Sequence, residues 1–347
     1  MSQSKDLQEI LDHIHSPAFI VRDGVISAVN QAAAQHFAEV GTVISEILET
    51  GQEEYANFRS GSLYLSLRLT GTVYHCTITQ LQEQQLFQLD EDIAHRDLQV
   101  LALASQQLCM PVSELSLILN RLPDIPQEEK AKLNQSIYKL QRILGNMADT
   151  EQYTTVSPAM VTQEICSLAE EVFEKSKTML ESIGVTLHYT LPNQPIFSLA
   201  EPEMLKRALY NMISNGVKFS SAGSRLEAVL TRSGNKIYIT VTNTAESDSL
   251  PGGSIFRRYQ RTPGLENSKF GLGLGMSLIH GVAAAHGGAV FLESNQKQGV
   301  KITMSLKIQK ASGTAVRSPV LKPDIYGGHD QALIELSDIL PYHLYEF

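Results

Sequence analysis

The sequence predicts a multidomain α+β protein, and three observations divide it into parts. The chain has 347 residues, more than one hydrophobic core usually organises. Near residue 92 its hydrophobic period changes from two, typical of strands, to the spacing of helices. Between residues 160 and 310, helical and strand-like segments alternate as in an α/β sandwich. We therefore predict domains over residues 1–90, 91–155 and 156–310, followed by a C-terminal tail over 311–347.

The first predicted domain consists of short strand-like runs separated by turns. Residues 18–21 and 25–29 flank the turn Arg22-Asp23-Gly24, and further runs cover residues 62–69 and 73–79. This alternation is typical of a small α/β domain.

The second predicted domain is a helical hairpin. Its apolar residues recur at a 3-4-3-4 spacing on both sides of a turn at 123–126: Leu98, Leu101, Leu108, Val112, Leu115, Leu119 and Leu122, then Leu133, Ile137, Leu140, Leu144 and Met147. The spacing predicts two helices with coiled-coil seams. Because two helices cannot bury both seams, we expect a second copy to complete a four-helix bundle, which makes the protein a homodimer.

The third predicted domain alternates helices and strands. The pattern predicts helices over 160–183, 202–217 and after Gly271, and strands over 186–191, 225–231, 236–243, 289–293 and 300–308. The tail contains one short amphipathic stretch over 331–340, to which the sequence assigns no role.

The composition excludes several classes of protein. With 43% hydrophobic and 19% charged residues, the chain is neither disordered nor fibrous. Its net charge of −9 disfavours broad binding to nucleic acid or anionic lipid. It shows no leader peptide and no run of about 18 apolar residues, so we expect a cytoplasmic protein. The widely spaced Cys76, Cys109 and Cys166 fit reduced thiols.

A glycine run, Gly271-Leu-Gly273-Leu-Gly275, precedes the last predicted helix. Glycines allow close backbone approach, and the free N–H groups of a helix start favour an anion, so the run suits a phosphate. A glycine-rich hairpin or a tight helix entry is the alternative explanation of this segment alone.

A second polar pattern lies on the helix predicted from Pro202. Asn211 and Asn215 are four residues apart and share a face, with Lys218 about one turn further along. Amide oxygens can bind Mg²⁺ and an ammonium group can meet phosphate. Alone, the segment would be explained as a polar helix face.

Together, in order, these motifs resemble a known family. Asn-x-x-x-Asn-Gly-x-Lys-Phe-Ser from Asn211, then Phe256-Arg-Arg-Tyr-Gln-Arg261, the glycine run and His286-Gly-Gly are similar to the ATP-binding domain of sensor histidine kinases, of the GHKL superfamily. The stretch from Asp12 to the alanines after Asn30 resembles the start of a PAS sensory domain. The resemblance spans residues 7 to 308 and implies a PAS-like sensor, a dimerisation hairpin and an ATP-binding α/β sandwich.

The resemblance implies ATP and Mg²⁺ as cofactors and assigns the residues that hold them. Asn215 would be a Mg²⁺ ligand beside Asn211, and Lys218 would approach the phosphates. Gly271, Gly273 and Gly275 would shape the phosphate loop, and Arg258 or Arg261 would steady the lid that follows.

The adenine motif departs from the family. Where the family carries Asp-x-Gly-x-Gly, this chain has Asn243-Thr-Ala-Glu-Ser. Asn243 still offers an acceptor oxygen to the adenine amino group, although a neutral acceptor is weaker than an ionised one by about 1 kcal/mol.

The phosphoacceptor motif departs further. The family reads Ser-His-Glu-Leu-Arg-Thr-Pro where this chain reads Ser105-Gln-Gln-Leu-Cys-Met-Pro111, so Gln106 stands at the acceptor position. A carboxamide has no nucleophilic ring nitrogen and cannot form phosphohistidine. Gln107 replaces the adjacent acidic residue, and Met110 replaces the polar residue that positions water for dephosphorylation of a partner. His95, about three turns earlier, is a less suitable acceptor, and Cys109 is best explained as a structural thiol.

These departures predict a histidine kinase homologue that binds ATP and Mg²⁺ without autophosphorylation at the standard position, a pseudokinase-like regulator. Its expected partners are a second copy of the chain and a response regulator or partner kinase. The alternatives are an active kinase that uses another acceptor residue or a partner protein, and a structural dimer module without nucleotide.

Overall fold

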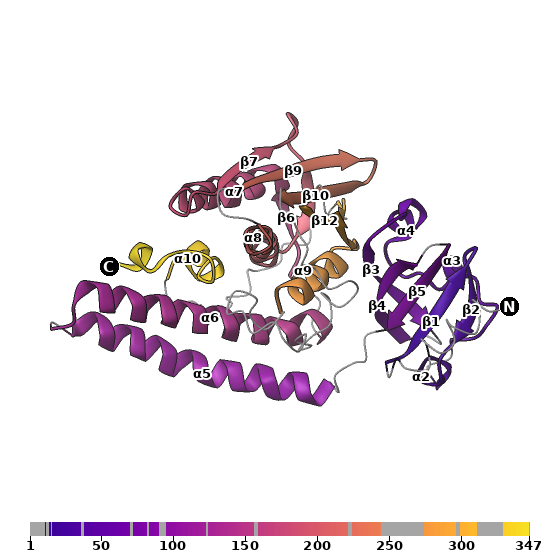
Figure 1. Cartoon of the computed structure of the whole chain (residues 1–347), viewed down its shortest axis with the longest axis horizontal. Helices are drawn as coiled ribbons and strands as arrows, with labels where there is room; N and C mark the ends of the chain where they lie inside the picture. Colours follow the sequence, from indigo (N-terminus) through magenta and orange to yellow (C-terminus); the bar gives the residue numbers. More distant parts are fainter. Residues whose placement is uncertain are drawn as a thin grey trace.

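The structure is a computed structural model that describes residues 11, 14, 16–35, 38–69, 72–81, 83–89, 95–122, 124–155, 159–220, 224–243, 274–295, 299–310 and 329–346. We call residues 16–89 the N-terminal unit, residues 95–155 the hairpin, residues 159–310 the α/β unit and residues 329–346 the C-terminal segment. Figure 1 shows the hairpin running below the α/β unit, with the C-terminal segment between them.

The N-terminal unit is built on five antiparallel strands in the order β2-β1-β5-β4-β3. Asp23 and Gly24 adopt positive φ at the predicted turn between the first two strands, as a tight hairpin requires. Phe19 stacks on Phe87 in its core, with ring centroids 5.0 Å apart. The elements are β1 (Ala18–Arg22), β2 (Val25–Val29), α2 (Gln31–Gln35), α3 (Ile44–Ile47), α4 (Gln52–Asn57), β3 (Ser62–Leu69), β4 (Thr72–Leu81) and β5 (Gln84–Leu89).

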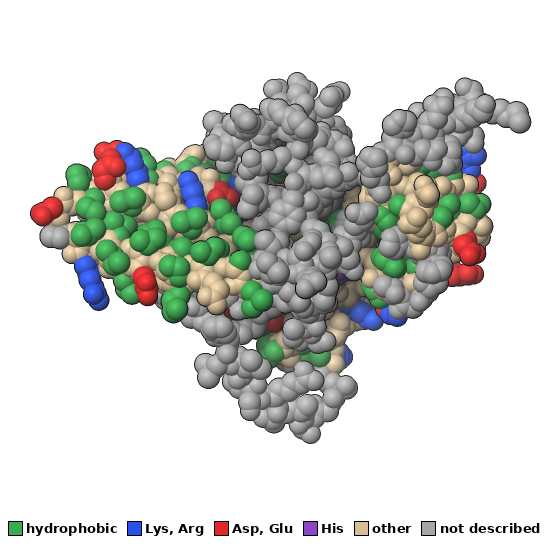
Figure 2. Space-filling view, turned by 90° about the horizontal axis from the view of Figure 1, so that it is seen from below, with side chains coloured by type: hydrophobic (Ala, Val, Ile, Leu, Met, Phe, Trp, Pro, Cys, Tyr) green, Lys and Arg blue, Asp and Glu red, His purple; other side chains and the backbone are tan. Residues whose placement is uncertain are grey.

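The hairpin consists of α5 (His95–Arg121) and α6 (Gln127–Thr155), where the sequence predicted it. Alternate members of the predicted seams have different environments. Val112 and Leu119 of α5 pack against Ile137 and Leu144 of α6 and are at most 8% exposed. A second row with the same seven-residue repeat is 45–54% exposed: Leu108, Leu115, Leu122, Leu133 and Leu140. Figure 2 shows hydrophobic side chains gathered on this face of the hairpin.

The α/β unit packs three helices on one sheet. Its strands follow the order β11-β12-β10-β9-β7, and only β7 and β9 are parallel. The elements are β6 (Val161–Glu164), α7 (Ile165–Glu181), β7 (Thr186–Thr190), β8 (Phe197–Ala200), α8 (Pro202–Lys218), β9 (Arg225–Ser233), β10 (Lys236–Asn243), α9 (Leu274–Ala285), β11 (Val290–Asn295) and β12 (Gly299–Lys307). Residues from all three helices and from the sheet share one buried core.

The prediction of a single helix over 160–183 is wrong at its beginning. Residues 161–164 form β6, which pairs with β8 in a separate two-stranded sheet. The helix begins after Glu164, whose carboxylate accepts hydrogen bonds from the backbone N–H groups of Cys166 and Ser167. The strands β5 and β8 were not predicted, because each is short and lacks a clear alternation.

The two units share one ten-stranded sheet. Strand β3 pairs with β11 through Ser62, Leu63 and Tyr64, opposite residues 290–292. Beside this joint the buried carboxylate of Glu54 pairs with the ammonium of Lys236 and accepts a 2.7 Å hydrogen bond from Ser305 Oγ. The sequence did not predict this joint.

The C-terminal segment forms α10 (Gln331–Glu335) and a 3₁₀ helix, η1 (Tyr342–Tyr345). Asp330 caps α10, and the fully buried Tyr345 joins the core of the α/β unit. Within the described ranges, no helix has the length and apolar character needed to cross a lipid bilayer.

We predict that Glu54→Ala lowers the free energy of unfolding by about 3–5 kcal/mol, because it leaves the Lys236 ammonium without its buried partner. Glu53 is the matched control, since it contacts the same ammonium at 3.8 Å from a side chain that is 69% exposed. Glu53→Ala should cost less than about 1 kcal/mol. Urea unfolding measures both, and equal losses would contradict the role given to Glu54.

Candidate functional site

The helix α8 carries the three polar residues that the sequence singled out. Its N-terminus is fixed by Glu201, whose carboxylate accepts a 2.6 Å hydrogen bond from Met204 N, and by Pro202 in the first turn. Asn211 is fully buried, Asn215 and Lys218 are partly buried, and all three lie on the part of α8 that meets α6, α9 or the C-terminal segment.

The start of α9 packs directly against this face. A Cβ atom at Gly275 would lie 2.8 Å from Oδ1 of Asn211 and 3.9 Å from Nδ2 of Asn215. Only glycine allows that approach. The last glycine of the predicted phosphate loop is therefore next to both asparagines, as the sequence argument required.

Both the amide nitrogen and the amide oxygen of Asn211 form hydrogen bonds within the protein. Its Nδ2 donates to the carbonyl oxygen of Arg207 at 2.9 Å and to Oε2 of Glu335 at 3.1 Å. Its Oδ1 accepts a 3.1 Å hydrogen bond from Nη2 of Arg142, a hairpin residue. Asn211 thus joins α8 to α6 and to the C-terminal segment.

Asn215 differs from Asn211 in having an open acceptor. Its Nδ2 contacts the sulfur of Met276 at 3.2 Å. Among the residues that the structure describes, no donor is assigned to its Oδ1, which is therefore an amide oxygen available to a cation.

Lys218 lies in an ion pair. Its ammonium contacts Oδ2 of Asp338 at 2.8 Å, and the same oxygen accepts a 2.6 Å hydrogen bond from Nη1 of Arg142. The side chain of Lys218 is 9% exposed and that of Asp338 is 26% exposed. Burial and the charge of Arg142 lower the pKa of Lys218. Although burial acts to raise it, Arg142 and Lys218 hold the pKa of Asp338 below its ordinary value.

A second carboxylate of the C-terminal segment lies deeper. Glu335 is fully buried and accepts a 2.6 Å hydrogen bond from Nε of Arg207. Arg207 also donates to Oδ1 of Asn146 on the hairpin at 2.8 Å. We call Arg142, Arg207, Lys218, Glu335 and Asp338 the charge cluster.

Sequence reasoning missed four members of the charge cluster. Arg142, Arg207, Glu335 and Asp338 each stand within an apolar pattern, where a charged residue signals a buried pair. The sequence therefore indicates that these charged residues are buried. It does not show which of them form pairs, because the partners lie some 130 to 200 residues apart in the chain.

Asn243, the predicted contact to adenine, has its amide engaged. Its Nδ2 donates to the carbonyl oxygen of Gly216 at 2.9 Å and to Ser220 Oγ at 3.1 Å. Its Oδ1 accepts a 2.6 Å hydrogen bond from Val300 N. In this structure Asn243 joins α8, β10 and β12.

The other predicted nucleotide residues, Arg258, Arg261, Gly271 and Gly273, lie outside the described residues. The site therefore consists of α8, the start of α9, α6 and the C-terminal segment.

The altered acceptor patch lies on α5. Gln106 is within the helix, and the side chains of its neighbours Gln107 and Met110 are exposed. Cys109 is half-buried, and burial raises the pKa of its thiol, so it is not an activated thiolate. His95 is the first residue of α5.

His286 has a structural environment. Its Nε2 accepts a 3.1 Å hydrogen bond from Glu201 N, and its Nδ1 contacts the carbonyl oxygen of Val282 at 2.7 Å. Burial lowers the pKa of this imidazole. A neutral His286 thus links the end of α9 to the start of α8.

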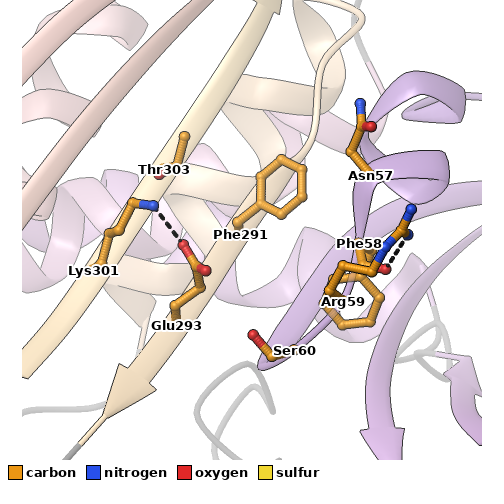
Figure 3. A pocket seen from close by; sticks show the side chains of 8 residues that line it. All are labelled: Asn57, Phe58, Arg59, Ser60, Phe291, Glu293, Lys301 and Thr303. Carbon is orange, nitrogen blue, oxygen red and sulfur yellow. Dashed lines mark hydrogen bonds and ion pairs between the residues drawn. The ribbon is translucent and has the colours of Figure 1, made fainter. Parts of the chain in front are cut away.

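A separate cavity of about 350 Å³ lies at the joint between the N-terminal unit and the α/β unit. Figure 3 shows Asn57, Phe58, Arg59 and Ser60 from the N-terminal unit facing Phe291, Glu293, Lys301 and Thr303. Lys301 and Glu293 pair at 2.7 Å across one wall. The cavity is distinct from the α8–α9 site.

Comparison with known proteins agrees with this geometry. Residues 200–310 match the family described as histidine kinase-, DNA gyrase B- and HSP90-like ATPases. The chain is 24% identical over 241 residues to the adaptive-response sensory kinase SasA of Synechocystis sp., covering 64% of this chain and 62% of that protein. It is 22% identical over 185 residues to the sensor protein VanS of Enterococcus faecium, covering 51% of this chain and 48% of VanS.

Among solved structures, full-length ShkA in complex with AMPPNP has a similar fold. The TM-score is 0.50 at 18% identity, with 62% of this chain and 47% of ShkA covered. The matched regions span less than two thirds of each of these three relatives. Residues 200–310 thus form an ATPase domain of the histidine kinase and gyrase type. About half to two thirds of the chain is similar in sequence to these sensor kinases.

We predict that Gly275→Ala lowers the free energy of unfolding by about 1–3 kcal/mol, because the new methyl group forces α9 away from Asn211. Ser277→Ala, two residues along the same helix, is the control and should change stability by less than about 0.5 kcal/mol. Urea unfolding followed by circular dichroism measures both. A Gly275→Ala variant as stable as the natural chain would show that the close approach of α8 and α9 is not required.

Proposed function

We propose that this chain is a regulator of histidine-kinase type that binds ATP with Mg²⁺ between α8 and the start of α9, and that does not phosphorylate itself at the standard position. The observation that carries the proposal is the open amide oxygen of Asn215, a residue that lies next to Gly275 through its amide nitrogen and is on the same helix as Lys218. In this proposal Asn215 binds Mg²⁺, Lys218 contacts phosphate, and the glycines from Gly271 to Gly275 approach it through their backbone.

The roles of the remaining predicted residues follow from the resemblance. Arg258 and Arg261 steady the lid over the nucleotide. The hydrogen bonds of Asn243 restrict its part in adenine recognition to the second lone pair of Oδ1, because Val300 N already occupies one.

Because position 106 is not histidine, the proposed output signal is a conformational change and not a phosphoryl transfer. Gln106 accepts no phosphoryl group, so the signal is a change of conformation that a response regulator or partner kinase reads. The PAS-like N-terminal unit supplies the input, and the β3–β11 joint is a rigid route from it to the ATPase domain. We propose a cytoplasmic location, as expected from the sequence.

The hairpin supports a homodimer. Its exposed row of Leu108, Leu115, Leu122, Leu133 and Leu140 repeats every seven residues on each side of the turn, next to a row that is already buried. A second hairpin would bury this row in a four-helix bundle.

The alternative of a module without nucleotide also has an observation in its favour. The ammonium of Lys218 and the amide of Asn211 are both engaged with the C-terminal segment. Measurement of nucleotide binding therefore decides between the two functions.

We predict that millimolar MgATP raises the melting temperature of the full chain, since a ligand bound to the folded state stabilises it. Asn215→Ala should weaken MgATP binding about 10- to 100-fold, the effect of one lost bond to a charged group. Asn193→Ala, in an exposed loop, is the control and should bind as the natural chain does. Calorimetry gives the affinities, and an absence of binding would favour the structural module.

The same samples test for kinase activity when they are incubated with ATP labelled at the γ-phosphate. We expect no acid-labile label on the chain. Label that disappears in His95→Gln would instead support an active kinase with another acceptor.

We predict that the natural chain is a dimer in solution and that Leu115→Glu weakens its association at least about 100-fold. Each of two symmetric copies loses roughly 1.5–3 kcal/mol of apolar burial. Leu117→Glu is the matched control, because Leu117 is 59% exposed and lies about 200° around α5 from Leu115. Sedimentation analysis distinguishes them, and dissociation by Leu117→Glu alone would place the interface on another face.

A further inference from the structure

The C-terminal segment occupies the space between the hairpin and the ATPase domain, as Figure 1 shows. Several contacts fix it there. Asn134 Nδ2 donates to the carbonyl oxygen of Tyr345 at 3.0 Å, and Gln135 Nε2 donates to that of Leu340 at 2.6 Å. Asp330 pairs with Lys175 at 2.7 Å. The segment is therefore bound to both α6 and α7.

Two of its acidic side chains, Glu335 and Asp338, contact cations of the candidate nucleotide site. Asp338 bridges Lys218 and Arg142 through one carboxylate oxygen, at 2.8 and 2.6 Å. Glu335 pairs with Arg207 and also contacts the amide of Asn211. Each carboxylate thus accepts hydrogen bonds from nitrogen donors that could otherwise bind an anionic ligand.

The charge cluster suits a more highly charged anion than the one it holds. The single carboxylate of Asp338 pairs with two cations at once, Lys218 and Arg142. These two positive charges therefore suit an anion that carries more than one negative charge. A polyphosphate carries that charge, whereas one carboxylate does not.

We propose that the C-terminal segment is an internal competitor of the nucleotide, with the carboxylate of Asp338 on Lys218 and Arg142 in the place of a phosphate group. This inference rests on the proposed nucleotide site. Bound polyphosphate takes the ammonium of Lys218, and Asp338 leaves it. Nucleotide and docked segment therefore exclude each other, and by linkage each weakens the binding of the other by the same factor.

The length of the connection suits such an exchange. Between Lys310 and His329 lie 18 residues, which can span up to about 60 Å when extended. A tethered segment keeps a millimolar effective concentration after release, so it competes continuously with nucleotide in solution. If the docked form is 90% populated, the apparent affinity for nucleotide falls about tenfold.

The exchange also reaches the hairpin. Arg142 of α6 contacts Asp338 and, on α8, both Asn211 and Ser214, so removal of Asp338 takes away one of the partners that fix Arg142 at α8. Nucleotide binding thereby loosens the hairpin from the ATPase domain, which gives the output a physical basis without phosphoryl transfer.

The test uses the full chain and three variants. Asp338→Asn removes the competing charge. Asn134→Ala removes the anchor on Tyr345, about 12 Å along α6 from Arg142, without changing any charge near Lys218. Glu346→Gln removes an exposed acidic charge of the same segment and is the control. MgATP affinity is measured by calorimetry, and hydrogen exchange is measured at the amides of residues 336–340 with and without MgATP.

We expect Asp338→Asn to bind MgATP about tenfold more tightly than the natural chain, Asn134→Ala several-fold more tightly, and Glu346→Gln within twofold. Saturating MgATP should accelerate exchange at residues 336–340 at least about tenfold in the natural chain, because the segment undocks. A purely local charge effect would change Asp338→Asn alone and leave exchange unaltered.

Two results overturn the inference, and they are distinguishable. If all chains bind MgATP equally, or if residues 336–340 stay protected at saturation, the nucleotide site exists and the segment does not compete for it. If none of the chains binds MgATP, including Asp338→Asn, the proposed nucleotide function is itself wrong.

Discussion

The buried charge cluster is the constraint on which the arrangement of this protein depends. Arg142, Arg207 and Glu335 are almost completely removed from solvent, and a buried charge persists only when it is paired and hydrogen-bonded. Their partners come from three parts of the chain, α6, α8 and the C-terminal segment. The charges of α6 and of α8 both pair with carboxylates of the C-terminal segment. The cluster therefore fixes the hairpin on the ATPase domain, with the C-terminal segment between them.

This arrangement gives the two sides of the hairpin different roles. On the side of the charge cluster, α6 presents polar groups such as Asn134, Arg142 and Asn146, each matched to a specific partner. On the exposed side it presents leucines at a seven-residue repeat. The hydrogen bonds and ion pairs on the polar side are specific, and each is lost when its partner moves away. The apolar packing of leucines is less selective and persists when one helix shifts along another. If a second copy covers these leucines, as proposed, the hairpin can remain in the dimer while it separates from the ATPase domain.

The fold of the hairpin and of most of the α/β unit could be predicted from the sequence, because both depend on local periodicity and on short motifs in a fixed order. Helix α8 and the strands β9 and β10 lie within two residues of their predicted limits. The errors lie where structure depends on distant pairing. Strand β6 forms only because β8 lies beside it, and the β3–β11 joint unites residues more than 200 positions apart.

The candidate site was predictable to a similar degree. Asn211, Asn215 and Gly275 are close together, as the motif order required. Asn211 and Asn243, however, form contacts that cannot be predicted from residue spacing. No role could be predicted for the tail, because its contacts are ion pairs of Glu335 with Arg207 and of Asp338 with Lys218. Periodicity shows which face is buried, but it does not show which charge faces which.

A site that has lost its acceptor residue can still be retained for energetic reasons. A ligand with micromolar affinity supplies about 8 kcal/mol, and a change of conformation needs only the part of that energy which differs between two states. At the charge cluster that difference is the exchange of one anion for another on Lys218 and Arg142. Because both anions satisfy the same buried cations, neither state leaves a charge unpaired, and the balance between them lies within a few kcal/mol. In the proposed function, Gln106 removes phosphoryl transfer from α5 and leaves this balance intact. The roles proposed for the glycines before α9 and for the amide of Asn215 then require binding alone.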